Sequence, residues 1–117
     1  SYRKLRQNIV DTQANVTDSL LYYKAVGKKV VGYGASAKGT VFLNTCGVTT
    51  ELLSTVYDNT VLKQGKFIPG RHQRVINHDE LDQINPDKVF LLAWNHYKEI
   101  VAKESQYADK FFSFRQV

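Results

Sequence analysis

A run of small residues follows a short apolar segment within residues 30–40. Gly32, Gly34 and Ala37 match the pattern G-x-G-x-x-G/A, in which a strand passes through a tight turn into a helix. Such a turn lets the backbone approach a phosphate closely and directs the first N–H groups of the helix toward it. The pattern therefore predicts a phosphorylated ligand, and by itself it indicates no reaction.

Residues inside and beyond this turn could contribute to the same site. Gly34 to Gly39 form the turn, and within it Lys38 could reach a phosphate or remain a solvated lysine. Asp58 lies 24 residues after Gly34, near the position where dinucleotide-binding folds place the acid that holds a ribose. The alternative is an ordinary turn at Asp58, because Asp side chains accept hydrogen bonds from nearby backbone.

Two later segments are expected at the same edge. Lys63, Gln64 and Gly65 form a basic turn that could clamp a diphosphate or be an ordinary solvated loop. Trp94 could stack on a flat ring while Asn95 donates and accepts hydrogen bonds; a core tryptophan followed by a helix-capping asparagine is the alternative. The basic residues at 71–74 lie nearer the third predicted strand, and we leave them out of the site.

The other reactive side chains predict no catalytic group and no metal site. The chain has three histidines, and their positions show no metal-ligand spacing. His96 fits a structural role at a helix start, although it could act as an acid or base. Cys46 is the only cysteine, and we expect it to be buried on a helical apolar face.

Composition limits the class of protein. At 117 residues, with 43% hydrophobic residues, the chain is one domain with a single core. The net charge of +5 fits a phosphorylated small molecule better than nucleic acid, since nucleic-acid binders usually carry more charge with interleaved aromatics. No apolar run approaches the ~20 residues of a membrane span. The single cysteine and the lack of a signal peptide predict a cytoplasmic protein.

The pattern of elements predicts an α/β fold. Residues 2–26 repeat apolar side chains with helical spacing, and Gly27 ends that helix. We expect residues 1–27 to be a helix that links to an upstream domain, and residues 28–117 to be a Rossmann-like domain. Its predicted strands are 30–33, 54–57, 74–76, 88–94 and 111–114. The predicted helices are 37–46, with Val41, Phe42 and Cys46 facing inward, a short helix capped by Asn77 and Glu80, and 96–105.

This order predicts a three-layer domain with a mostly parallel sheet of about five strands. In such sheets, ligands bind beyond the carboxyl ends of the strands, where the glycine turn, Asp58 and Trp94 would meet. Residues 59–73 show no periodicity, and a loop of that length in a compact domain is often functional.

Three segments resemble one known family. They are residues 32–40, residues 58–70 and residues 91–95, and the resemblance spans about residues 28–100. The chain resembles the C-terminal domain of S-adenosylmethionine-dependent sugar C-methyltransferases, which act on nucleotide-linked deoxy-keto-sugars.

This resemblance implies an enzyme with an N-terminal zinc-binding module, a central methyl-donor domain and this C-terminal domain. The nucleotide-sugar would lie between the last two domains, against Gly34 to Lys38, Lys63 to Gly65, and Trp94 with Asn95. The reaction removes a proton beside a keto group and transfers methyl to the carbanion. We expect S-adenosylmethionine and the catalytic base upstream of this chain. Two alternatives stay open: a self-standing module for a dinucleotide such as NAD, and an interaction domain without a ligand.

Overall fold

The computed structural model describes residues 2–92 and 96–113, and its centre is a five-stranded sheet. The strands are β1 (Val30–Tyr33), β2 (Thr55–Tyr57), β3 (Arg74–Ile76), β4 (Lys88–Leu91) and β5 (Phe111–Phe112). They pair in the order β3-β2-β1-β4-β5, and every neighbouring pair is parallel. The predicted parallel α/β fold is therefore confirmed, with β1 at the centre of the sheet.

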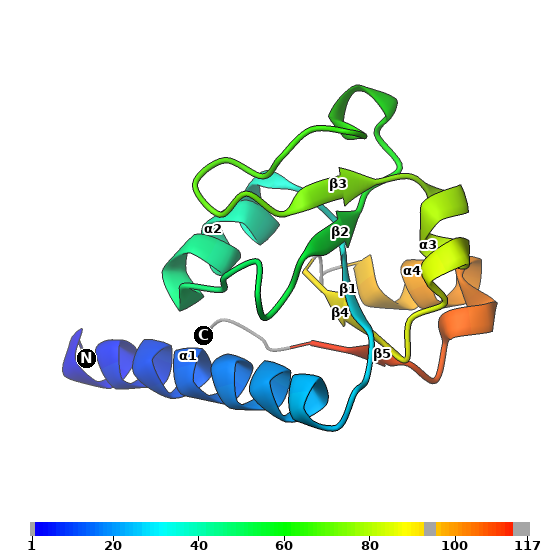
Figure 1. Ribbon diagram of the computed structural model, residues 1–117. Helices are drawn as coiled ribbons and strands as arrows, with labels where there is room; N and C mark the ends of the chain where they lie inside the picture. The colour runs from blue at the N-terminus through cyan, green and yellow to red at the C-terminus, as the bar shows by residue number, and fades with distance from the viewer. Residues whose placement is uncertain (1, 93–95, 114–117) are drawn as a thin grey trace.

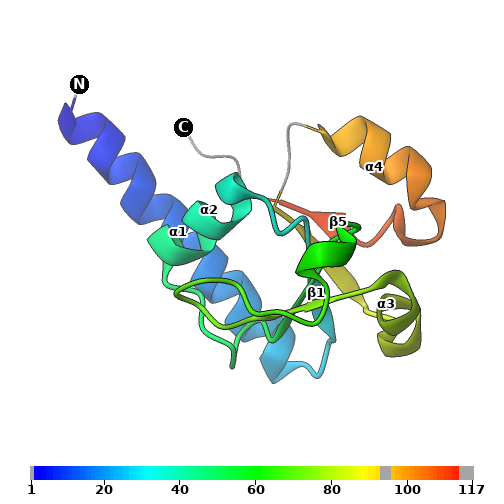
Figure 2. The ribbon, with the colours of Figure 1, turned by 90° about the horizontal axis from the view of Figure 1, so that it is seen from above.

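Helices cover both faces of this sheet. They are α1 (Tyr2–Ala25), α2 (Ala37–Cys46), α3 (His78–Ile84) and α4 (Tyr97–Lys103). Figures 1 and 2 show α1 and α2 on one face and α3 and α4 on the other. Because parallel strands bury both faces, alternate residues of one strand enter different cores: in β4, Val89 packs on the α3 side, whereas Phe90 packs on the α2 side. The result is a three-layer domain.

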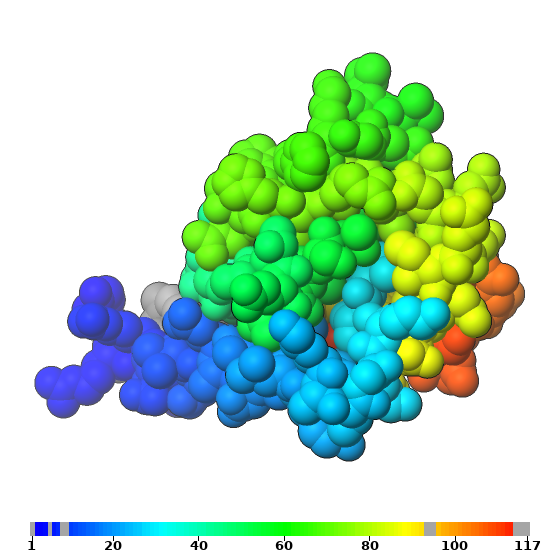
Figure 3. Space-filling view, viewed as in Figure 1, coloured from blue at the N-terminus to red at the C-terminus, as the bar shows by residue number. Residues whose placement is uncertain are grey.

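The second half of α1 is packed into the domain. Val16 and Leu20 are almost completely buried in the core shared with α2, while Tyr23 contacts the ring of Phe112. The first turns extend past the rest of the molecule (Figures 1 and 3), and Tyr2 and Val10 are exposed there. The apolar spacing thus identified the helix correctly, and two residues of its predicted stripe, Val16 and Leu20, are buried in the core.

Short-range signals set the bounds of α2 and α3. Ser36 caps α2 by accepting a hydrogen bond from the Gly39 amide, and Gly47 ends it in the left-handed conformation (φ 64°). Asn77 caps α3 by accepting from the Glu80 amide. The Glu80 carboxylate departs from the predicted capping box, because it pairs with Arg74 at 2.7 Å.

Several predicted details were wrong. Strand β4 ends at Leu91 instead of continuing to residue 94, and residues 93–95 lie outside the described part of the chain. Strand β2 starts at residue 55, β5 ends at 112, and α4 is shorter than residues 96–105. Val41 is 59% exposed, because the inward face of α2 is already filled by Phe42, Leu43 and Cys46. The predicted burial of Cys46 is confirmed.

The aperiodic segment 59–73 is hydrogen-bonded to the sheet. It forms a 3₁₀ turn at Val61–Lys63 and then runs back beside β3, where the Gly65 amide donates to the Val75 carbonyl at 2.8 Å and the Val75 amide donates to the Lys66 carbonyl at 2.8 Å. The side-chain amide of Asn44 donates to the Pro69 carbonyl at 3.2 Å, which links the segment to α2. It stands above β3 in Figures 1 and 3, held in place by these bonds.

Candidate functional site

The glycine turn follows β1 at the carboxyl edge of the sheet. Gly34 has φ +98°, a conformation that L side chains rarely adopt, and its amide donates to the Tyr57 carbonyl at 2.8 Å. A Cβ at Gly39 would lie 2.7 Å from the Gly34 carbonyl oxygen and 3.0 Å from the Cβ of Leu92. The turn therefore needs glycine at both positions to fold, whether or not a ligand binds.

Asp58 connects this turn to the segment after β2. One carboxylate oxygen accepts from the Ala35 amide at 2.8 Å, and the other accepts from the Thr60 amide at 2.7 Å. The residue is only 8% exposed. The hydrogen bond from the Thr60 amide is the local turn that the sequence allowed as the alternative role of Asp58. The hydrogen bond from the Ala35 amide additionally links Asp58 to the glycine turn. A contribution of Asp58 to ligand binding stays a prediction.

The basic turn packs back onto the same place. The Lys63 ammonium donates to the Ala35 carbonyl at 3.0 Å, and the Gln64 side-chain amide donates to the Asp58 carbonyl at 2.9 Å. The glycine turn, Asp58 and the basic turn are thus in contact with one another, as the sequence predicted. Asp58 and the basic turn thus hold residues 34–37 of the glycine turn in place. We call residues 34–37 the ridge, because they line two separate hollows.

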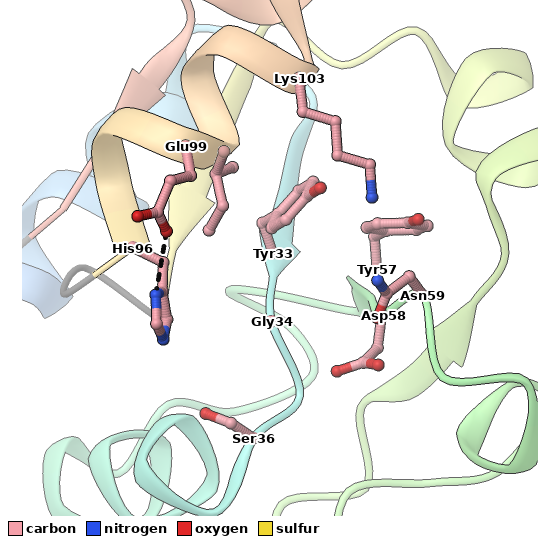
Figure 4. Close-up of a pocket in the computed structure, with 10 residues that line it drawn as sticks. Tyr33, Gly34, Ser36, Tyr57, Asp58, Asn59, His96, Glu99 and Lys103 are labelled. Atoms are coloured by element: carbon pink, nitrogen blue, oxygen red, sulfur yellow. Dashed lines mark hydrogen bonds and ion pairs between the residues drawn. The ribbon is translucent and has the colours of Figure 1, made fainter.

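The first hollow is a pocket of about 300 Å³ between the ridge and α4 (Figure 4). We call it the polar pocket after the charged and hydroxyl-bearing side chains among its lining residues, although most of its surface is apolar. Its lining residues are Tyr33, Gly34, Ser36, Tyr57, Asp58, Asn59, His96, Glu99, Ile100 and Lys103. The two tyrosine rings lie 4.8 Å apart between centroids and form one wall. His96 contacts Glu99 at 3.1 Å. Lys103 extends from α4 toward the Tyr57 ring (Figure 4), so this pocket holds an ammonium group, an imidazole and carboxylates.

The second hollow is an apolar groove of about 560 Å³ between α2 and the segment after the basic turn. Its lining residues are Ala35, Ala37, Thr40, Val41, Lys63, Lys66, Phe67, Ile68, Pro69 and Val75. Phe67 is 61% exposed and Val41 59% exposed, so both side chains are open to solvent at this groove. Two lysines border an otherwise apolar surface.

The predicted site residues therefore separate into three sets. Gly34, Ser36 and Asp58 line the polar pocket, and Ala35, Ala37 and Lys63 line the apolar groove. Lys38, Gly39, Gln64 and Gly65 line neither hollow: Lys38 and Gly65 are exposed, and Gly39 is buried beneath the turn. Trp94 and Asn95 lie outside the described residues.

Sequence reasoning considered His96 only as a possible acid or base, and it missed Glu99 and Lys103 on the wall that α4 provides. His96, Glu99 and Lys103 are spaced by three and four residues, which places them on one side of a helix. That spacing was visible in the sequence and could have identified the face. It could not show that this face turns toward the glycine turn, because that depends on how α4 packs on the sheet. Phe67 was missed because its segment shows no periodicity.

Beneath the polar pocket lies a buried hydrogen-bonded network. The Tyr33 hydroxyl donates to the Glu104 carboxylate at 2.7 Å, and the other oxygen of Glu104 contacts His78 Nε2 at 2.9 Å. This hydrogen bond raises the pKa of His78 above its ordinary value. Burial, followed by the bond to Glu104, raises the pKa of Tyr33 far above its ordinary value. Tyr33 is therefore a neutral hydroxyl, and the imidazolium form of His78 is favoured.

Comparison with known proteins then decides the family. Residues 1–114 match the family model described as the C-methyltransferase C-terminal domain. The chain belongs to this family. The C-methyltransferase NovU of Streptomyces niveus is 33% identical over 108 residues, which are 92% of this chain and 26% of NovU. The resemblance in the glycine turn and the later segments is confirmed, and this C-methyltransferase domain spans about a quarter of the relative's length.

Within residues 2–92 and 96–113, no helix is both long enough and apolar enough to cross a bilayer. In the same residues, no three side chains among His, Cys, Asp and Glu gather as ligands for a metal ion.

Proposed function

We propose that this domain binds the nucleotide-linked keto-deoxysugar that an S-adenosylmethionine-dependent C-methyltransferase methylates. The observation that supports it most directly is the ridge between two hollows of different character. A nucleotide-sugar has a flat base, a negatively charged diphosphate and a hydroxylated sugar. The domain offers an apolar groove with lysines, a helix start and a polar pocket, side by side.

The diphosphate fits the ridge. The amides of Ala37 and Lys38 are in the first turn of α2, where a helix offers no internal acceptor, and the helix dipole favours negative charge there. Lys63 and Lys66 lie on the groove side of this turn, and Lys103 lies on the pocket side. Lys38 is exposed at the same turn, and no described carboxylate forms an ion pair with it. Four lysines therefore belong to the turn or to the linings of the two hollows beside it.

The apolar groove fits the base of the nucleotide. The exposed ring of Phe67 can stack on a heterocycle, and such contacts are worth roughly 0.5–1.5 kcal/mol beyond the area that they bury. The polar pocket then takes the sugar. Ser36, His96 and Glu99 supply donors and acceptors for hydroxyl and keto groups. We assign no catalytic residue to this chain, and the base that removes the proton is expected in another part of the enzyme.

The methyl donor fits this chain less well. Dinucleotide-type folds hold a ribose with a free acid after the second strand. Here, both oxygens of Asp58 already accept backbone amides. The same observation disfavours a self-standing NAD module. S-adenosylmethionine is therefore assigned to the upstream domain that the family resemblance implies.

Titration of the chain with thymidine diphosphoglucose and uridine diphosphoglucose, followed by amide chemical shifts, tests the proposal. We expect shifts at residues 34–38, 63–67 and 96–103, and none of that pattern with S-adenosylmethionine or NAD. Phe67→Ala should weaken binding by about threefold to tenfold. Val10→Ala, an exposed apolar residue on α1, is the matched control and should bind like the wild type.

Other outcomes refute the proposal. Binding of S-adenosylmethionine without a response to either nucleotide-sugar would contradict it. Micromolar binding of NAD would favour the dinucleotide module. A folded chain that binds none of these molecules would favour the interaction domain.

A further inference from the structure

Below the polar pocket, Glu104 joins three elements of the fold. Its carboxylate is 5% exposed, which is rare for an acidic side chain unless it is paired. One oxygen accepts from the Tyr33 hydroxyl of β1, and the other contacts His78 of α3. We call Tyr33, His78 and Glu104, with Asp82 and Tyr107 behind them, the Glu104 network.

We propose that Glu104 is a positioning residue for the polar pocket, which it shapes by fixing the end of α4 against the tyrosine wall. This inference rests on the proposed function. Glu104 does not line the pocket. It is adjacent in sequence to Lys103, which does, and its amide donates to the Ile100 carbonyl at 2.8 Å. Because the Glu104 carboxylate is bonded to Tyr33 and His78, it fixes the backbone beside it and with it the position of Lys103 in the pocket lining.

The tyrosine wall is held by the same network. The Tyr33 hydroxyl donates to Glu104, and the Tyr33 ring lies tilted against the Tyr57 ring with their centroids 4.8 Å apart. The Tyr57 ring in turn meets the His78 ring edge-on at 5.4 Å. One carboxylate thus fixes both rings of the wall and the helix opposite them.

The charge on His78 controls the strength of this arrangement. Three groups face the imidazole: Glu104 from the end of α4, Asp82 from α3 at 3.2 Å, and the Tyr57 ring from β2. Two carboxylates and no cation among these neighbours favour the imidazolium ion. Loss of that proton removes the imidazolium charge and leaves only one ring nitrogen able to donate, so the contact to one of the two carboxylates loses its hydrogen bond. We therefore expect the pocket to loosen as the pH rises.

Nucleotide-sugar binding across pH tests the inference. Thymidine diphosphoglucose is a suitable probe because its diphosphate is esterified at both ends and does not titrate between pH 6 and 8. We expect Glu104→Gln to weaken binding by about fivefold to tenfold and to accelerate amide exchange across residues 97–103. His78→Gln should remove most of the pH dependence of the wild-type affinity. Asp109→Asn, an exposed acid outside the network, is the control and should bind like the wild type.

Each outcome is decisive. Glu104→Gln and His78→Gln variants that bind like the wild type at every pH would overturn the inference. Faster exchange in α4 without a change in affinity would also overturn it, since Glu104 would then only stabilise the fold. If the wild type binds no nucleotide-sugar, the proposed function fails. The amide exchange of Glu104→Gln then decides separately whether Glu104 fixes α4, and unchanged exchange across residues 97–103 would overturn that role as well.

Discussion

Replacement of Asp58 by asparagine separates its two possible roles. The carboxylate accepts two backbone amides and is 8% exposed. Asparagine keeps one acceptor oxygen and places an NH₂ group against the other amide. An amide left without its partner costs about 1–3 kcal/mol, and hydrogen bonds to a charged acceptor are worth about 1.5–3 kcal/mol. We therefore expect Asp58→Asn to lower the free energy of unfolding by about 2–3 kcal/mol, because the buried Ala35 amide is affected.

Thermal unfolding followed by circular dichroism measures this effect. For a domain of this size, about 2–3 kcal/mol corresponds to a fall in Tm of roughly 8–15 °C. The matched control is Asp109→Asn, an exposed acid that should change stability by less than about 0.5 kcal/mol. A Tm for Asp58→Asn within about 2 °C of the control would refute the structural role of the two hydrogen bonds that Asp58 accepts. Unchanged stability with lost nucleotide-sugar binding would instead identify Asp58 as a ligand-binding residue.

Three further results are expected. Gly39→Ala should destabilise the domain by about 1–3 kcal/mol in urea unfolding, because overpacking against the turn outweighs the helix-propensity gain of ~1 kcal/mol; Thr45→Ala, exposed in the same helix, should not destabilise it. Asn77→Ala should cost about 1 kcal/mol by the same assay, since it removes the cap of α3. The pKa of His78 is raised in the folded state, so its contribution is complete below its unfolded pKa of about 6.5 and is lost as the pH rises through the folded pKa. Unfolding from pH 5.5 to 8.5 should show this decline, and a His78→Gln variant that retains it would contradict the assignment.

The sequence predicted those parts of the fold that are encoded by short-range signals. Strand β1, helix α2 and strand β3 have the predicted bounds. The signals for them are local: runs of β-branched residues favour strands, Ser36 caps the start of α2, and Gly47 ends it. The end of β4 was less predictable, since the apolar residues that follow Leu91 continue the strand pattern. Leu92 is completely buried although the strand ends at Leu91. Its apolar side chain therefore indicated that the residue is buried, which is not the same as being part of the strand.

The candidate site was predictable only on one side. Residues of the glycine turn and the basic turn carry recognisable patterns, and the structure brings them together through Asp58 and Lys63. The opposite wall depends on the packing of α4 on the sheet. Glu104 shows the difficulty most clearly, because an acidic residue at the end of a helix is normally solvated, and only its tertiary contacts with Tyr33 and His78 reveal a buried role.

The glycine turn illustrates why a phosphate-binding pattern alone cannot identify a ligand. Gly34 and Gly39 are required by the fold itself, through a positive φ and a close approach to the Gly34 carbonyl. Such glycines would persist in a domain that had lost its ligand. Phe67 and Lys103, by contrast, are large side chains that border the two hollows and are bound to neither ridge nor sheet by a described hydrogen bond. Their substitution, more than that of the glycines, distinguishes a nucleotide-sugar site from a turn that the fold alone requires, because it removes proposed ligand contacts and is expected to leave the fold intact.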